Sequence, residues 1–354
     1  METVTWSSRS ENEEIDEEGK SDIYLHGVPI PPQILAEILV RVDGRRDVGY
    51  ICPLVCRRWY NVLSAPGFWI SYMIYRSMDL PPSFLRNEPS LNVKKVSLQQ
   101  AFGRNLISNP SGDDGYQNWE IYEDGDPCRS QIFISDLNPL TLYGGDSDEA
   151  GELREKWLRT SIRMEFGIEK PPVGCIALEE IPVAFVTSYD WCSKFQIIDL
   201  WKEGIERAFL DEFCPPITVS EYHTGRFDCA SIYLLEVQLL PDGSIPLPHR
   251  ITPGFLFYTR HPRLPQQHDR LQHGLPQDDE TTDTSITRIR MLDVLEIEWQ
   301  KIEHTFSNYP KGIRYVLFRH SGKDQQFWAG HYGSKMAKAS VIVNYGNGKR
   351  RSIL

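Results

Sequence analysis

Residues 28–44 read VPIPPQILAEILVRVDG, and the ordered pattern of the chain begins in this stretch. Proline cannot continue a helix from upstream but suits a first helical turn, so the prolines ahead of the apolar run indicate a helix start. The apolar residues then recur at the spacing of one helical face: Ile34, Leu35, Ile38, Leu39 and Val42. The following Asp-Gly pair interrupts the pattern, and we expect the helix to end there.

Two further helical segments follow directly. Residues 51–63 read ICPLVCRRWYNVL, and their apolar positions again fit helical spacing. The sequence APG at 65–67 ends this segment, and FWI at 68–70 begins a third. Three short helices enclose little core, and a unit of this size usually relies on a partner for stability. The sequence therefore predicts a small helical unit with apolar side chains available to another protein.

From about residue 97 the pattern changes to short alternating runs separated by Gly, Pro, Asn and Asp. The clearest runs are residues 231–240, 312–320 and 340–345. We expect each run to be a strand, with Tyr315 and Leu317 on one face of the second and Val316 and Phe318 on the other. An amphipathic helix is expected at residues 201–213. Several short strands with turn residues between them predict a β-sandwich or barrel.

Composition and charge describe an ordinary globular protein. The chain has 354 residues, of which 40% are hydrophobic, and a formal net charge of −11. This length suggests about two domains, and the acidic balance argues against a nucleic-acid-binding protein. No apolar run approaches the length of a membrane span, and the first residues lack the order of a signal peptide.

Cysteine usage points to a reducing compartment. The seven cysteines are Cys52, Cys56, Cys128, Cys175, Cys192, Cys214 and Cys229. Their number is odd and no two have CxxC spacing, so neither a disulfide framework nor a zinc site is expected. We expect a cytoplasmic protein that binds no metal and no cofactor.

The two ends of the chain are charged. Residues 10–20 read SENEEIDEEGK, a density of like charge that predicts a disordered acidic arm over residues 1–24. This arm is either a solvated leader or an interaction tail. Residues 346–354 form a basic tail, in which the three basic residues 349–351 are either solvated or a localisation signal.

Two internal stretches fit the strand pattern poorly. Residues 128–180 mix Pro, Gly and acidic residues, and residues 245–286 contain six prolines. We expect the second stretch to be a long surface loop, which is uncommon in a compact domain and is either functional or disordered. Three of its histidines, His261, His268 and His273, have spacings that match no usual metal-ligand geometry.

Residues 28–69 resemble an F-box. Val28-Pro29 stands where the family has Leu-Pro, residues 54–59 (LVCRRW) follow its Val-Cys-x-x-Trp pattern, and Phe68-Trp69 stands at its closing Leu-Trp. The resemblance implies binding to the Skp adaptor of cullin–RING ubiquitin ligases through apolar helix contacts. The residues expected to contact the adaptor are Pro29, Ile34, Leu35, Ile38, Leu54, Val55 and Trp59. The alternative is a helical bundle without this partner.

The second half of the chain resembles the F-box-associated domain. The matching blocks are RNLISNP at 104–110, TSYDWC at 187–192, QIIDL at 196–200, GRFD at 225–228, FSNYPKGIR at 306–314 and FWAGHYG at 327–333. The resemblance implies an α + β multidomain protein, with a three-helix F-box followed by an all-β, jelly-roll-like sandwich of about ten strands. The expected domains are the acidic arm 1–24, the F-box 25–72, a linker 73–96, the sandwich 97–345 with insertions near 128–180 and 245–286, and the tail 346–354.

Several members of that family recognise N-linked glycans, which implies a site at one end of the sandwich for the chitobiose core. The residues that map onto it are Tyr189, Phe327, Trp328 and Ala329, with Asp228 as the candidate for sugar hydroxyls. Phe327 stands where the family has tyrosine. The loss of one hydroxyl hydrogen bond to the glycan lowers the binding free energy by about 1 kcal/mol. His331 stands where the family has tryptophan. The alternatives are a client bound without a glycan, or aromatics that only support the loop.

The resemblance implies a non-catalytic receptor that links a client to a ubiquitin ligase. The sequence contains no GxSxG, GxxxxGK[ST], HExxH or dinucleotide fingerprint, so nothing in it points to an enzyme. A scaffold without ligase function is the remaining alternative, and it would require the F-box resemblance to be vestigial.

Overall fold

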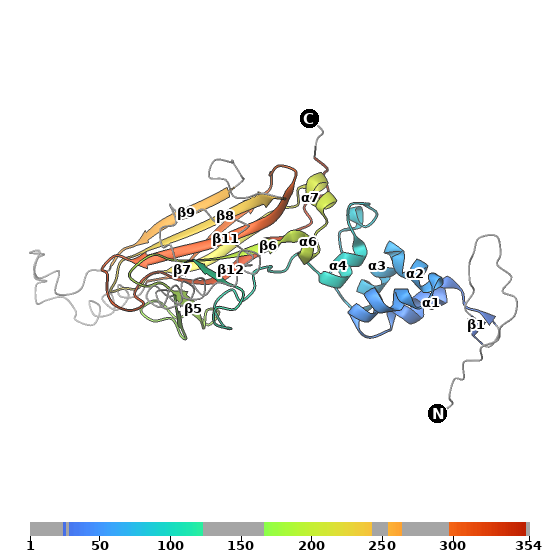
Figure 1. Cartoon of the computed structure of the whole chain (residues 1–354), viewed down its shortest axis with the longest axis horizontal. Coiled ribbons are helices and arrows are strands. Elements are labelled where there is room, and N and C mark those ends of the chain that lie inside the picture. Colours follow the sequence, from blue (N-terminus) through green and yellow to red (C-terminus); the bar gives the residue numbers. More distant parts are fainter. Residues whose placement is uncertain (1–23, 26–27, 123–165, 243–253, 264–296, 352–354) are drawn as a thin grey trace, which may run out of the picture. The chain divides into compact units, whose positions relative to one another are not determined.

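The structure, a computed structural model, describes residues 24–25, 28–122, 166–242, 254–263 and 297–351. The chain divides into two compact units, residues 1–100 and residues 101–354. Helices dominate the described part of the first unit, and strands dominate the second (Figure 1). No helix in the described ranges is long and apolar enough to cross a membrane. The acidic arm and most of both predicted insertions lie outside these ranges.

The first unit contains the three predicted helices. They are α1 (Pro32–Val40), α2 (Arg57–Ser64) and α3 (Pro66–Tyr75), preceded by the short strands β1 (Tyr24–Leu25) and β2 (Val28–Pro29). Proline occupies the first turn of both α1 and α3. Backbone N–H groups in a first turn have no acceptor within the helix, so the absence of one in proline costs no hydrogen bond. The buried core of the unit includes Leu39, Leu63 and the rings of Trp69 and Tyr72, whose centroids lie 5.5 Å apart. The Trp69 indole N–H donates to the Leu63 carbonyl at 2.7 Å.

The expected continuous helix over residues 51–63 is wrong in its first half. Residues Asp47–Ile51 form a π-helical turn (η1) and Cys52–Leu54 a 3₁₀ turn (η2), and Cys56 is extended, with φ −163°. Pro53 follows Cys52 directly and lacks the N–H that a continuous helix would need. The chain therefore turns before α2 begins.

The expected linker at 73–96 is part of the first unit. It contains a 3₁₀ turn, η3 (Ser83–Leu85), and leads into α4 (Val93–Gln99), whose Asn92 side chain accepts from the Lys95 N–H at 3.0 Å. Val93 and Val96 of α4 are buried. The helical unit thus gains a fourth helix to complete its small core.

The second unit confirms the predicted sandwich of about ten strands. One sheet has the order β10-β7-β12-β5-β4 and the other β3-β6-β11-β8-β9, with antiparallel pairing throughout. The strands are β3 (Glu120–Tyr122), β4 (Gly167–Glu169), β5 (Ala184–Val186), β6 (Cys192–Asp199), β7 (Ile217–Thr224), β8 (Ser231–Pro241), β9 (Gly254–His261), β10 (Gln300–Phe306), β11 (Ile313–Asp324) and β12 (Lys335–Val343).

Strand β11 shows the period-2 alternation predicted for it. Leu317 lies in one hydrophobic cluster with Phe195 and Leu240, and Tyr315 packs against the same cluster. Phe318 faces the other way and packs against the ring of Trp119. Because β11 pairs with β6 on one side and β8 on the other, its alternation sets the register of the whole sheet.

Two sequence expectations for this unit are wrong. The single helix at 201–213 is two short helices, α6 (Leu200–Glu203) and α7 (Arg207–Phe213), because Gly204 adopts φ +115° between them. The expected surface loop at 245–286 contains β9, which pairs along Ser231–Gln238 of β8. In β9 the apolar residues Phe255 and Phe257 alternate with exposed ones, a short pattern that the surrounding prolines obscured.

The described part of the predicted basic tail contacts α7. The Arg351 N–H donates to the Glu212 carbonyl at 2.8 Å, and the Arg351 guanidinium lies 5.4 Å from the ring centroid of Tyr309. Arg350 lies 3.6 Å from the Glu212 carboxylate. These residues therefore add to the packing of the second unit.

A chain of buried polar side chains crosses between the two sheets. Lys194 on β6 donates to Nε2 of His320 on β11, which leaves the His320 Nδ1–H to donate to Glu221 on β7, at 2.6 Å. The Tyr233 hydroxyl donates to the second oxygen of Glu221. The Lys194 Nζ also lies 3.4 Å from the Phe185 ring centroid. Burial lowers the pKa of Lys194 well below its ordinary value.

Candidate functional site

The first candidate surface lies on the first unit, where apolar side chains are exposed. Ile34 and Ile38 are one helical turn apart on α1 and both are about half exposed. Leu54 in η2 is 82% exposed, and its neighbour Val55 is 60% exposed. Isolated exposed aliphatics are ordinary, but several on one small unit indicate a protein-binding surface.

The other residues predicted to contact a partner are placed differently. Leu35 is only 3% exposed and belongs to the unit's own core, and Trp59 is half-buried on α2. Pro29 lies in β2. Periodicity identifies an apolar stripe, but it cannot say which edge of the stripe faces inward and which faces out.

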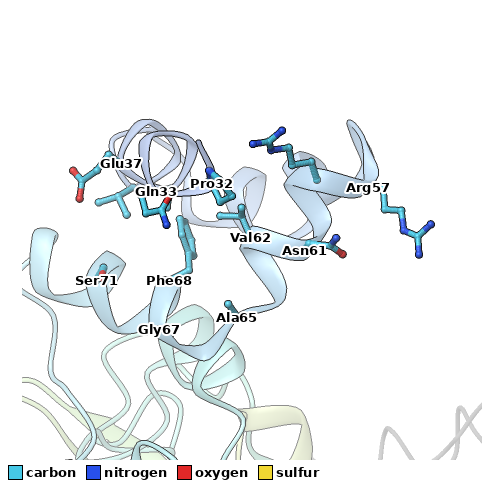
Figure 2. Close-up of a pocket in the computed structure, with 13 residues that line it drawn as sticks. Pro32, Gln33, Glu37, Arg57, Asn61, Val62, Ala65, Gly67, Phe68 and Ser71 are labelled. Carbon is cyan, nitrogen blue, oxygen red and sulfur yellow. The ribbon is translucent and has the colours of Figure 1, made fainter. Parts of the chain in front are cut away.

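A groove of about 760 Å³ lies between α1, α2 and the start of α3 (Figure 2). Gln33, Val62 and Phe68 point toward it from the three helices. Its charged lining comes from Glu37 on α1 and from the arginines at the start of α2. None of the predicted contact residues lines this groove, so it is a feature that the sequence reasoning missed. Several lining residues, among them Arg57, Arg58 and Phe68, lie in the F-box motif segments, but none of them was predicted to contact the adaptor.

The second candidate surface is one end of the sandwich, where three loops are tied together. They join β5 to β6, β7 to β8, and β11 to β12. The Ser188 hydroxyl donates to the Gly330 carbonyl at 3.0 Å, and the Gln325 N–H donates to the Ala230 carbonyl at 2.8 Å. The Thr187 N–H donates to Ser334 at 3.0 Å. These bonds join the loops that carry Tyr189, Asp228 and Phe327, and two of the three bonds link positions more than 100 residues apart in the chain.

The β11–β12 loop presents two aromatic side chains to solvent. Phe327 is 71% exposed and Trp328 is 37% exposed. Phe327 has φ +56°, a conformation that is uncommon for a residue other than glycine. The Asp324 carboxylate accepts from the N–H of Gln326 at 3.1 Å and of Phe327 at 2.7 Å, which fixes this turn. The next residue, Ala329, is also exposed.

The remaining predicted residues, Tyr189 and Asp228, differ in how accessible their side chains are to a ligand. Tyr189 is half-buried and follows Ser188, so the Ser188–Gly330 bond holds its loop against the one that carries Trp328. Asp228 accepts from Arg226 through both carboxylate oxygens, at 2.9 and 3.0 Å. The hydrogen bond from Arg226 holds the pKa of the Asp228 carboxyl below its ordinary value. This carboxylate is thus already engaged by a cation.

The structure adds side chains that the sequence reasoning missed. Tyr332 packs its ring against Trp328, and the Arg226 guanidinium lies over the Tyr332 ring. Both residues lie in the motif blocks GRFD and FWAGHYG, from which the sequence predicts only Asp228, Phe327, Trp328 and Ala329 as site residues. A search for residues that support the aromatic pair, in addition to residues that contact a ligand, would have included them.

The described ranges contain no group of three or more His, Cys, Asp or Glu residues arranged to hold a metal ion. His261, one of the three histidines considered for this role, lies in β9 and is hydrogen-bonded to His223 at 3.2 Å. His268 and His273 lie outside the described residues.

Comparison with known proteins identifies a family match in the second unit. Residues 146–255 and 285–343 match the model of the F-box associated region. The chain is 28% identical to F-box only protein 6 of Rattus norvegicus over 323 aligned residues. The alignment covers 90% of this chain and 87% of the relative. It is 27% identical over 317 residues to F-box only protein 44 of Homo sapiens, an alignment that covers 89% of this chain and 95% of the relative. It is 26% identical over 327 residues to F-box only protein 17 of Homo sapiens, an alignment that covers 89% of this chain and 91% of the relative.

Proposed function

This chain belongs to the F-box proteins that carry an F-box associated region, and from that membership we propose that it is the substrate-recognition subunit of a cullin–RING ubiquitin ligase. In this role the helical unit binds the Skp adaptor and the loop end of the sandwich binds a client protein. The observation that carries the proposal is the exposed aliphatic surface of the helical unit.

The exposed side chains of that surface are suited to a helical partner. Burying one Leu or Ile side chain contributes roughly 1.5–3 kcal/mol. Ile34, Ile38, Leu54 and Val55 together therefore supply an apolar interface core of useful size. The groove beside α1 adds a concave site for one further partner side chain or helix.

The adaptor role is tested by co-purification of the full-length chain with purified Skp adaptor. Leu54→Asp places a charge at a fully accessible position, so we expect it to abolish capture while the protein stays folded. Phe84→Asp is the matched control, because Phe84 is also exposed, at 54%, but lies in η3 outside this surface. Retained capture by Leu54→Asp would contradict the proposal.

The client that best suits the loop end is a glycoprotein with an exposed chitobiose core. Phe327 and Trp328 offer flat apolar faces, which suit the apolar face of a sugar ring. The three tied loops fix the positions of these rings before a ligand arrives, which lowers the entropic cost of binding.

The mechanism is positioning. The receptor holds a client lysine near the conjugating enzyme of the ligase, so that a bimolecular transfer becomes effectively intramolecular. The chain itself forms and breaks no bond. The proposed compartment is the cytoplasm, which agrees with the six free cysteines of the described part of the chain.

The client proposal is tested by calorimetric titration of the full-length chain with chitobiose. We expect saturable binding to wild type and none to Trp328→Ala. If neither protein binds chitobiose while adaptor capture is retained, the glycan part of the proposal fails and the client is recognised through its polypeptide.

A further inference from the structure

We propose that Tyr332, supported by Arg226 and Asp228, is a positioning residue that sets the orientation of the Trp328 indole for client binding. The inference deepens the proposed function and rests on it for the identity of the ligand. It assigns Asp228 a place behind the binding surface, and it removes that carboxylate from the set of groups that touch a sugar.

The contact between Tyr332 and Trp328 has the geometry of a specific aromatic pair. Their ring centroids are 5.4 Å apart and their planes lie at 87°, an edge-to-face arrangement. Such pairs are favourable because the positive edge of one ring meets the negative face of the other. Trp328 is 37% exposed while Tyr332 is half-buried, so Tyr332 is the anchored member and Trp328 the presented one.

Tyr332 is itself held by a cation. The Arg226 guanidinium carbon lies 4.7 Å from the Tyr332 ring centroid, within the range of a cation–π interaction. The hydrogen bonds from Arg226 Nε and Nη2 to the two Asp228 oxygens, at 2.9 and 3.0 Å, fix the plane of the guanidinium. The side chains of Arg226 and Asp228 are 14% and 19% exposed, so solvent screens this pair only in part.

The backbone around Arg226 leaves that side chain little freedom. A Cβ added to Gly174 would come within 3.2 Å of Arg226 Cγ and 3.3 Å of its Nε, so the arginine already packs closely on the glycine. The Phe227 N–H donates to the Gly174 carbonyl at 3.0 Å and keeps the two segments together. The support behind Tyr332 therefore comes from two different loops.

The turn between Trp328 and Tyr332 is also fixed. Gly330 has φ +122°, and a Cβ at this position would lie 3.0 Å from Tyr332 Cε2. The Ser188 hydroxyl donates to the Gly330 carbonyl at 3.0 Å. A fixed turn and a fixed tyrosine leave the indole one favoured orientation, and a ligand then binds without ordering it.

The test uses the full-length chain labelled with 5-fluorotryptophan and observed by fluorine NMR. The Trp328 resonance is the one that disappears in Trp328→Phe. We expect Tyr332→Leu to shift and broaden this resonance, because the neighbouring ring is lost, and Tyr332→Phe to leave it close to its wild-type position. Arg226→Lys and Asp228→Asn should produce intermediate changes, because each weakens the support without removing the ring.

The same variants are titrated with chitobiose. We expect Tyr332→Leu to bind about fivefold more weakly, since an edge-to-face pair contributes on that scale, and Tyr332→Phe to restore the affinity. Tyr258→Leu is the matched control: Tyr258 lies on β9, and the Arg260 guanidinium lies 5.9 Å from its ring centroid. The control should change neither the resonance nor the affinity.

The two readouts separate this inference from the proposed function. An unchanged Trp328 resonance in Tyr332→Leu, or full chitobiose affinity despite a changed resonance, overturns the positioning role. If wild type binds no chitobiose, the glycan proposal fails. The fluorine response then decides by itself whether Tyr332 sets the indole orientation.

Discussion

The His320 imidazole donates from Nδ1 to the Glu221 carboxylate at 2.6 Å, and this contact joins the two sheets across the sandwich interior. Both side chains are fully buried. The Tyr233 hydroxyl donates to the other Glu221 oxygen, and Lys194 completes the chain on the far side of the imidazole. Glu221 is thus the acceptor shared by His320 and Tyr233 from the opposite sheet.

Removing that acceptor should destabilise the fold strongly. Glu221→Ala leaves the buried His320 Nδ1–H and Tyr233 hydroxyl without an acceptor, and each unsatisfied buried group costs about 1–3 kcal/mol. Urea unfolding of the full-length chain measures the change. Glu303→Ala is the control, since Glu303 pairs with Lys301 on the surface, where such pairs contribute under about 1 kcal/mol. Equal effects of the two substitutions would contradict this account of the interior.

Stability should fall as the pH is lowered below about 6.5. Burial lowers the pKa of His223 to about 3 and of His261 to about 4. The unfolded chain, with ordinary histidine pKa values near 6.5, binds more protons than the folded chain between these limits. Each histidine therefore removes up to about 1.4 kcal/mol of folding free energy per pH unit in that window.

Urea unfolding at pH 7, 6 and 5 measures this slope. The double substitution of His223 and His261 by Asn should reduce the slope without abolishing it. The buried His320, whose pKa burial also lowers to about 4, remains in that variant. A free energy of unfolding that rises on acidification in wild type would be inconsistent with neutral buried histidines.

The two sides of α1 should respond differently to substitution. Leu35 is buried, so Leu35→Ala should lower the free energy of unfolding by about 2–5 kcal/mol through lost burial and a residual cavity. Ile38 is about half exposed, so Ile38→Asp should leave unfolding nearly unchanged and abolish capture of the Skp adaptor. Chemical unfolding and co-purification of the same two variants check the prediction. Adaptor capture by Ile38→Asp at wild-type level would show that this face of α1 is not part of the adaptor-binding surface.

Adding a hydroxyl at Phe327 should strengthen glycan binding. Phe327 is 71% exposed, so Phe327→Tyr meets no steric obstacle. One additional neutral hydrogen bond contributes about 1 kcal/mol, which corresponds to about fivefold in affinity. Titration with chitobiose measures the gain, and Phe327→Leu, which keeps an apolar side chain without a ring, should show a loss. An unchanged affinity in both variants would place Phe327 outside the binding surface.

The sequence determined the local elements of this protein. The periodicity in residues 32–40 and the alternation in residues 231–241 predicted α1 and β8, because the residues that generate each pattern are neighbours in the chain. The ordered motif blocks predicted the helical unit and the sandwich. The sequence missed β9, whose short alternation lies among prolines, and the division of residues 201–213 at Gly204.

Only the tertiary structure decided which side chains are available to a ligand or partner. It buried Leu35 and exposed Ile34, although the two are adjacent on one apolar stripe. It paired Asp228 with Arg226 and placed Tyr332 between that pair and Trp328. Such contacts join loops that are far apart in the chain. Their geometry depends on sheet register and loop closure, and the local pattern of residues encodes neither of these.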